Sequence, residues 1–283
     1  MSGTTIQQFT SNLLIELKNE YPEYEIRQMS KLILQHILQV SNTQLLMMSQ
    51  ELLKDEQLKR LLEYAKQLKE HIPLQYIVGS TEFYGLEFKV NPSVLIPRPE
   101  TEELVDWILK DKLAPENLLD IGTGSGCIAI SLKANLPNTK VTAWDISDKA
   151  LETAQNNATQ LGHAVHFAQV DVLTHQADEA MYDCIVSNPP YVRELDKEMM
   201  APNVLDNEPH TALFVSDHDP LIFYRTIAQL GQTTLKSNGH LYFEINEYLA
   251  KDMTDMLSQL GYSNIECRKD INGKDRMMKA VKS

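Results

Sequence analysis

Apolar residues in the first 70 positions recur at intervals of three and four, which is the spacing of one face of an amphipathic helix. The segments Ile26–Val40 and Leu58–Leu68 both show this spacing. Pro22 and the polar residues 41–43 separate the periodic segments and are typical of turns. We therefore predict a small helical bundle over residues 1–72.

The pattern changes between residues 73 and 99, where short apolar runs are bounded by glycine and proline. The runs Tyr76–Val78 and Leu86–Val90 predict two strands, with Gly79 and Gly85 between them. Pro97 and Pro99 stiffen the chain that follows. We expect this segment to form a β-hairpin linker.

From residue 100 to residue 283, apolar runs typical of buried strands alternate with helical periodicity. The expected strands are Leu118–Ile121, Val141–Asp145, Val165–Val170, Asp183–Asn188 and His240–Ile245. Helices are expected from Cys127 to Leu136 and from Ala150 to Leu161, the second with Ser147 as its N-cap. Such alternation indicates the α/β class, with a mostly parallel sheet covered on both faces.

A glycine-rich loop joins the first of these strands to its helix. It comprises Gly122, Thr123, Gly124, Ser125 and Gly126. Glycines permit a tight turn and close approach of a ligand, and the helix N-terminus presents free N–H groups. The spacing lacks the final glycine of dinucleotide sites and the lysine of phosphate loops. It resembles the first motif of Rossmann-like methyltransferases, so we expect the loop to bind S-adenosyl-L-methionine.

Acidic residues end the next two strands. Asp145, at the end of the second, is expected to accept hydrogen bonds from the cofactor ribose, although a helix cap or surface role is the alternative. Asp171 and Val172, at the end of the third, are expected beside the adenine. For these two, an ordinary loop role is the alternative.

The fourth strand ends in Asn188, Pro189, Pro190 and Tyr191, at the edge where open α/β sheets bind ligands. The prolines remove two backbone donors, and the Asn188 side chain offers a carbonyl acceptor. A planar substrate –NH₂ could donate to Asn188 Oδ1 and the Pro189 carbonyl while stacking on Tyr191. We expect all four residues to bind substrate. Asn188, Pro189 and Tyr191 are the expected catalytic residues, and Asn188 is also expected to contact the cofactor. A simple strand terminator is the alternative.

The composition of the chain limits the kinds of partner that the protein can bind and indicates its location in the cell. The formal net charge of −13 argues against nucleic acid and suits either a basic protein partner or simple solubility. The chain has no apolar run long enough for a membrane span and no N-terminal signal pattern. Its three cysteines are far apart and lack metal-ligand spacing. We expect a cytoplasmic protein with reduced thiols, no metal and no membrane contact.

Motifs spread over nearly the whole chain resemble the peptide chain release factor N5-glutamine methyltransferase family. Besides residues 188–191, they are Pro73–Ile77, Phe83–Leu86, Leu95–Thr101, Glu208-Pro209 and Phe243–Ile245. The resemblance implies a class I methyltransferase domain over residues 100–283 and a substrate-recognition domain over residues 1–72. It implies class 1 release factors as partners, with the glutamine of their Gly-Gly-Gln motif converted to N5-methylglutamine. It also implies that Arg98 and Glu100 lie near the cofactor, a structural salt bridge being the alternative.

Two departures and three alternatives accompany the resemblance. Residues 214–220 replace a usually glycine-rich stretch, and Val172 stands where an aromatic ring is common. A glutamine methyltransferase of a ribosomal protein shares the same catalytic parts. A nucleic-acid adenine N6-methyltransferase shares the Asn-Pro-Pro-Tyr motif, but it must also flip a base and bind phosphates. The third alternative is a non-catalytic scaffold that retains the fold.

Overall fold

The computed structural model describes residues 3–176 and 179–283, which form two compact units. The first unit contains the residues up to Gly79 together with the short segment Pro202–Asn207. The second unit contains Ser80–Ala201 and Glu208–Ser283. No helix in these described ranges is long and apolar enough to cross a bilayer.

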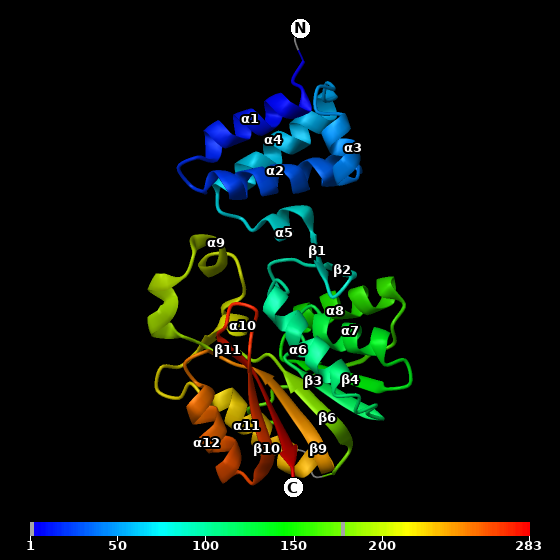
Figure 1. Ribbon diagram of the computed structural model, residues 1–283, viewed down its shortest axis with the longest axis vertical. Coiled ribbons are helices and arrows are strands. Elements are labelled where there is room, and N and C mark those ends of the chain that lie inside the picture. Colours follow the sequence, from blue (N-terminus) through cyan, green and yellow to red (C-terminus); the bar gives the residue numbers. More distant parts are fainter. Residues whose placement is uncertain (1–2, 177–178) are drawn as a thin grey trace. The chain divides into compact units, whose positions relative to one another are not determined.

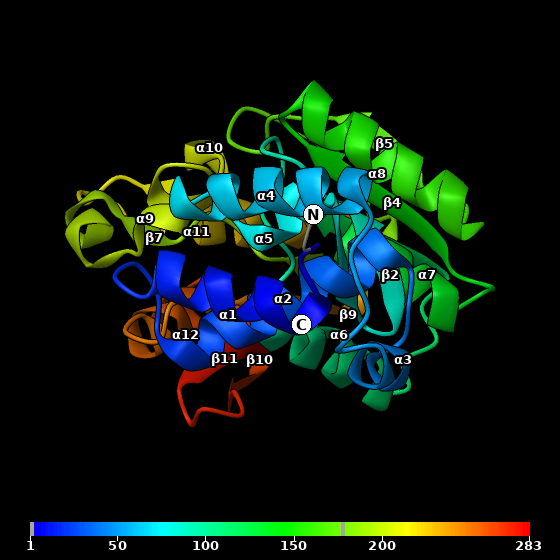
Figure 2. The same ribbon diagram turned by 90° about the horizontal axis from the view of Figure 1, so that it is seen from above.

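The first unit is a helical bundle in which α1, α2 and α4 lie side by side (Figures 1 and 2). Its helices are α1 (Ile6–Leu17), α2 (Glu23–Leu38), α3 (Asn42–Met47), α4 (Asp55–Lys69), α5 (Leu74–Val78) and α9 (Pro202–Leu205). The apolar faces of α1 to α5 form one core that includes Phe9, Leu34 and Leu61. The predicted bundle is confirmed, although α2 ends before Val40, and Leu62 is more than half exposed.

Polar side chains define where two of these helices begin. The Thr5 hydroxyl accepts from the backbone of Gln8, and the Gln8 side chain accepts from the backbone of Thr5. Ser41 and Gln44 make the same reciprocal pair at α3. Such capping boxes satisfy backbone N–H groups that a helix start leaves without partners.

The strand predicted at Tyr76–Val78 is wrong, because these residues belong to α5. The helix starts after Pro73 and ends at Gly79, whose φ of +79° and N–H bond to the Gln75 carbonyl form a left-handed C-cap. A run of three apolar residues cannot distinguish a strand from a helical turn. The hairpin instead consists of β1 (Ser80–Phe83) and β2 (Leu86–Lys89).

A seven-stranded, mostly parallel sheet forms the centre of the second unit. In spatial order its strands are β10 (Tyr262–Lys269), β11 (Asp275–Lys282), β9 (Leu235–Glu244), β6 (Tyr182–Ser187), β3 (Asn117–Ile121), β4 (Lys140–Asp145) and β5 (His166–Gln169). The five strands from β9 to β5 run parallel, whereas β11 is antiparallel to both of its neighbours. The predicted α/β class is confirmed. The C-terminal pair β10–β11 was not predicted.

Helices cover both faces of this sheet (Figure 1). One face packs against α6 (Pro99–Lys110), α7 (Cys127–Asn135) and α8 (Asp148–Leu161), and the other against α11 (Ile222–Thr234) and α12 (Ala250–Gln259). Successive residues of β3 pack into the two cores alternately: Leu118 lies on the first face and Leu119 on the second. The remaining short elements are β7 (Val192–Arg193), η1 (Glu194–Met199), α10 (His210–Leu213) and β8 (Phe214–Val215).

The parallel strands bring the predicted site residues to one edge of the sheet. Ile121, the last residue of β3, pairs with Trp144 of β4 and with Ser187 of β6. The residues that follow these three strands therefore emerge side by side, which is where open α/β sheets bind ligands.

Candidate active site

A cavity of about 360 Å³ opens at the carboxyl ends of β3, β4 and β6. Its volume lies within the range of small-molecule sites. The predicted residues that line it are Gly122, Gly124, Asp145, Asp171, Val172, Asn188, Pro189 and Pro190. The structure therefore brings together most of the residues that the sequence singled out on four different strand ends.

The three loop glycines have two different roles. Gly122 and Gly124 adopt φ values of +75° and +55° and line the cavity. A Cβ atom built on Gly124 would meet nothing within 4 Å, so its hydrogen leaves free space above the loop. A Cβ on Gly126 would instead lie 2.8 Å from Ile130 Cδ1. The first two glycines open room for a ligand, and the third permits close packing of the helix.

Thr123 and Ser125, which were predicted to contact the cofactor, have buried side chains that do not line the cavity. Gly126 lies outside the lining as well. The Thr123 hydroxyl donates to Asp120 Oδ2 at 2.7 Å, which fixes the loop to the strand below it. Burial raises the pKa of Asp120 to about 7.

Asp145 connects the end of β4 to the glycine loop. Its Oδ2 accepts from the backbone of Gly124 at 2.8 Å, and its Oδ1 accepts from Ser147 at 2.9 Å. Burial raises the pKa of this carboxyl. Each carboxylate oxygen has two lone pairs, so both can also accept from a diol in the cavity. The same side chain thus orients the loop and faces the ligand space.

Asp171 and Val172 form the wall beyond β5. Asp171 Oδ1 accepts from the backbone of Leu173 at 3.0 Å, which closes a local turn. Val172 is 9% exposed and packs into the core while lining the cavity. The aliphatic side chain therefore gives this wall an apolar surface.

The Asn-Pro-Pro-Tyr corner lies next to the glycine loop. A Cβ on Gly122 would lie 4.0 Å from the carbonyl oxygen of Asn188. Tyr191 does not line the cavity, and its hydroxyl donates to Glu244 Oε1 at 3.0 Å. Burial and the nearby charge of Glu244 raise the pKa of Tyr191, so the phenol stays protonated. The structure thus places three of the four predicted substrate residues on the cavity and the fourth behind it.

Two buried polar residues behind this corner were not predicted as site residues. Glu244 ends β9, is 1% exposed and accepts from Thr101 Oγ1 at 2.6 Å. Thr101 Oγ1 also lies 3.4 Å from Asn188 Nδ2, which donates to it. A carboxylate that ends a buried apolar strand was the available signal, because a buried charge needs partners.

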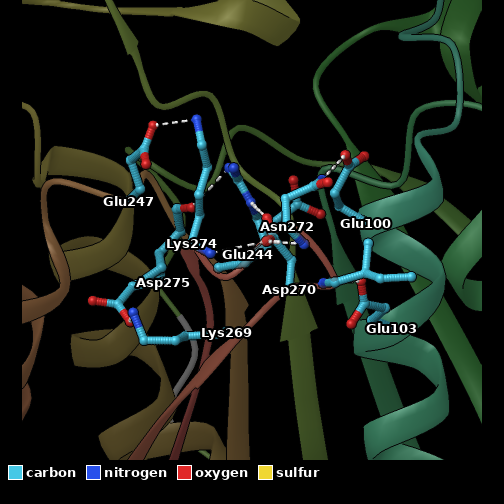
Figure 3. A network of polar contacts seen from close by, with 12 residues as sticks. Glu100, Glu103, Glu244, Glu247, Lys269, Asp270, Asn272, Lys274 and Asp275 are labelled. Atoms are coloured by element: carbon cyan, nitrogen blue, oxygen red, sulfur yellow. Dashed lines mark hydrogen bonds and ion pairs between the residues drawn. The ribbon is translucent and has the colours of Figure 1, made fainter.

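Arg98 and Glu100 do not line the cavity. Arg98 forms an ion pair with Glu208, which agrees with the salt-bridge alternative. Glu100 Oε1 accepts from Asn272 at 3.4 Å in the network of Figure 3. The cavity wall also includes residues that were not predicted, from two further segments and α11: Ser93, Val94, Leu95, Pro209, Thr211, Ala212, Phe214, Phe223 and Ile227.

Comparisons with known proteins find matches in both units of the chain. Residues 100–270 match the family model of the methyltransferase small domain, and residues 7–79 match that of the PrmC N-terminal domain. The chain is 46% identical to the release factor glutamine methyltransferase of Flavobacterium psychrophilum, covering 97% of this chain and 98% of that protein. It is also 46% identical to the release factor glutamine methyltransferase of Bacteroides thetaiotaomicron, covering 97% and 99%.

The fold has a solved counterpart in a methyltransferase from Pyrococcus furiosus, with a TM-score of 0.53 and 18% identity over 81% of this chain and 100% of that one. This likeness concerns the fold alone. Family membership depends instead on the sequence matches, which span both units. The chain belongs to the release factor glutamine methyltransferase family.

Proposed function

We propose that this chain transfers a methyl group from S-adenosyl-L-methionine to the glutamine side-chain amide of the Gly-Gly-Gln motif in class 1 peptide chain release factors. The product is N5-methylglutamine. One observation carries the proposal: Asn188 and Pro189 line the same cavity as Gly122 and Asp145. A cofactor held by the loop would thus lie beside acceptors suited to a planar –NH₂ group.

The residues of the cavity fit the cofactor. When bound, S-adenosyl-L-methionine supplies an electrophilic methyl group on a sulfonium sulfur. Gly122 and Gly124 would leave room for its amino-acid end, and Asp145 would accept from the ribose hydroxyls. Asp171 and Val172 would lie along the adenine. Thr123, Ser125 and Gly126 would support this cradle through the backbone and through packing.

The corner at residues 188–191 would hold and orient the substrate amide. An amide nitrogen is a poor nucleophile because its lone pair is delocalised into the carbonyl. Asn188 Oδ1 and the Pro189 carbonyl would each accept one of its two protons, which increases electron density at nitrogen and aims it toward the methyl group. Fixed alignment of this kind can contribute up to about 7–11 kcal/mol in favourable cases. Pro190 would confine the amide plane, and Tyr191 would support the corner from behind through its bond to Glu244.

The two units divide the work under this proposal. The first unit, up to Gly79, would recognise the release factor, and the second unit, from Ser80 on, would bind the cofactor and catalyse transfer. The net charge of −13 disfavours direct binding of nucleic acid and suits a basic face on a protein partner. The reaction would then take place in the cytoplasm, where release factors act on ribosomes.

The test uses isotope-labelled cofactor and the full chain with three separate substrates: a class 1 release factor, large-subunit ribosomal proteins and double-stranded DNA. We expect label only on the release factor. Mass spectrometry of its Gly-Gly-Gln peptide should show one added methyl group on glutamine. A release factor with glutamic acid in place of that glutamine is the matched control. Label on a ribosomal protein or on adenine instead would overturn the proposal in favour of that alternative.

A further inference from the structure

One buried carboxylate connects the two polar side chains of the Asn-Pro-Pro-Tyr corner. Glu244 Oε1 accepts from the Tyr191 hydroxyl at 3.0 Å, and Oε2 accepts from Thr101 Oγ1 at 2.6 Å. Thr101 Oγ1 in turn lies 3.4 Å from Asn188 Nδ2. The carboxylate belongs to β9 and the threonine to the first turn of α6, so two separate elements meet behind the corner.

The number of protons fixes the direction of this chain of hydrogen bonds. A threonine hydroxyl has one proton, and an ionised carboxylate can only accept. Because the Thr101 proton goes to Glu244, Thr101 Oγ1 can only accept from Asn188. The Asn188 amide must therefore present its –NH₂ to Thr101. Its other end, the carbonyl Oδ1, is then free for a ligand.

Glu244 accepts from two hydroxyls and lies near one cation, and these contacts offset part of the cost of burying its charge. Burial raises the pKa of Glu244, and the bonds from Thr101 and Tyr191 and the positive charge of Arg276 oppose that rise. Arg276 Nε donates to Asp270 Oδ2 at 3.0 Å, and its guanidinium also contacts the Ile245 carbonyl. A cation is thus fixed on β11, close to the end of β9.

The turn between β10 and β11 holds this cation in place. Asp270 Oδ1 accepts from the backbone of Asn272 and of Lys274, at 2.9 and 3.0 Å. Figure 3 shows these residues gathered beside the first turns of α6, where Glu103 accepts from the backbone of the turn. The turn is therefore fastened to the same helix that carries Thr101.

We propose that Thr101 and Glu244 are positioning residues that set the orientation of the Asn188 side-chain amide, so that its carbonyl oxygen and not its –NH₂ faces the substrate nitrogen. The proposal deepens the proposed function and rests on it. Without the chain, the amide of Asn188 is free to rotate by half a turn. In the rotated form it presents two donors to a substrate group that is itself a donor, which opposes binding in the reactive geometry.

The specific prediction concerns Thr101→Val, which removes the hydroxyl but keeps nearly the same side-chain shape. We expect kcat for release factor methylation to fall by about 10- to 100-fold, the scale of an orientation error near a reacting group. KM for the release factor and calorimetric affinity for S-adenosyl-L-methionine should change by less than about 3-fold, since Thr101 itself does not line the cavity. Thr101→Ser restores the hydroxyl and should recover most of kcat.

Thr139→Val is the matched control. Thr139 is buried, and its hydroxyl donates to the Pro115 carbonyl at 2.6 Å, directly before the amino end of β4. This variant should lose stability but keep kcat. Circular dichroism and thermal unfolding of all variants distinguish loss of structure from loss of orientation. If Thr101→Val keeps the wild-type kcat, or if Thr101→Ser is as slow as Thr101→Val, the positioning role is wrong.

Glu244→Gln supplies an independent test through its combination with Thr101→Val. Because both residues act through one chain, the double variant should be no more than about 3-fold slower than the slower single variant. If the fold losses in kcat of the two single variants multiply in the double variant, the two residues have separate roles and the proposal is overturned. A wild-type chain that fails to methylate the release factor would instead refute the proposed function, so the two failures are distinguishable.

Discussion

Arg98 and Glu208, which are 110 positions apart in the chain, form an ion pair with 2.5 Å between Nη2 and Oε1. Glu208 is almost fully buried, and its second oxygen accepts from the backbone of Ile96 at 3.2 Å. The segments on either side of this pair, Ser93–Leu95 and Pro209–Phe214, both contribute residues to the cavity wall. The ion pair therefore fastens together two parts of the wall that the sequence keeps far apart.

Arg98→Ala should lower the stability of the second unit by about 2–3 kcal/mol, because it leaves the Glu208 carboxylate buried without its cation, while Ile96 N–H still donates to Oε2. Urea unfolding followed by tryptophan fluorescence measures this directly, since Trp107 and Trp144 both lie in that unit. Adding Glu208→Gln removes the unpaired charge and should recover part of the loss. A double variant that is less stable than Arg98→Ala alone would contradict this account.

Asn188→Ala should preserve cofactor affinity and reduce kcat by about 10²–10³-fold, the usual loss when one polar contact aimed at the reacting group is removed. The reason is that the variant loses the acceptor for the substrate –NH₂ while the loop and Asp145 remain intact. Calorimetry with S-adenosylhomocysteine and steady-state methylation of a release factor separate the two effects. An equal loss of cofactor binding would show that Asn188 mainly holds the cofactor.

Asp145→Asn should have the opposite effect and weaken cofactor affinity first. The amide keeps the shape but loses one acceptor, so it cannot serve Gly124, Ser147 and a ribose diol together. We expect an affinity loss of about 10- to 30-fold, equivalent to one charge-assisted hydrogen bond. Asp148→Asn, three residues later in the first turn of α8 and outside the cavity lining, is the control. Comparable losses in both variants would exclude a direct role for Asp145.

Substitutions at two of the loop glycines should have different effects, one mainly on stability and the other mainly on cofactor binding. Gly126→Ala places a methyl group 2.8 Å from Ile130 Cδ1 and 3.1 Å from Ala154 Cβ at a φ of +82°, so it should destabilise the second unit by about 2–4 kcal/mol. Gly124→Ala meets no protein atom within 4 Å and should cost only the backbone strain of about 1 kcal/mol. Its methyl group would extend beside the cavity and should weaken cofactor binding. Urea unfolding measures the stability of both variants, and calorimetry measures their affinity for the cofactor. A larger stability loss in Gly124→Ala than in Gly126→Ala would contradict this account.

The sequence predicted the parallel strands because buried strands have apolar runs that end in glycine, acidic or amide residues. Asp145, Asp171 and Asn188 could be placed at one edge from that pattern alone. The antiparallel pair β10–β11 was missed because β10 is mostly polar and little buried, and polar residues interrupt the buried residues of β11. Tyr76–Val78 was assigned wrongly because so short a run has no usable period.

The supporting contacts of the site could not be predicted in the same way. Thr101 and Glu244 are 143 positions apart, and nothing in the local sequence indicates that the Thr101 hydroxyl donates to the Glu244 carboxylate. The same holds for the wall formed by Phe214 and Ala212, which depends on how a loop folds back over the strand ends. Periodicity identifies which element a residue occupies, but long-range contacts follow from packing.

The ionisation of Asp120 should lower the stability of the second unit as pH rises. Burial raises its pKa to about 7 in the folded chain, from an ordinary value of 3.8, so between these values the folded state keeps a proton that the unfolded chain has released. Stability therefore decreases from about pH 4 to pH 7 and levels off above it. Asp120→Asn cannot ionise and, between pH 5 and pH 8, should gain on the order of 3 kcal/mol relative to wild type. Urea unfolding of both proteins at pH 5 and pH 8 measures the difference, and comparing the two chains cancels the similar contribution of Asp145. A stability difference that stays constant with pH would mean that Asp120 ionises normally despite its burial under the loop.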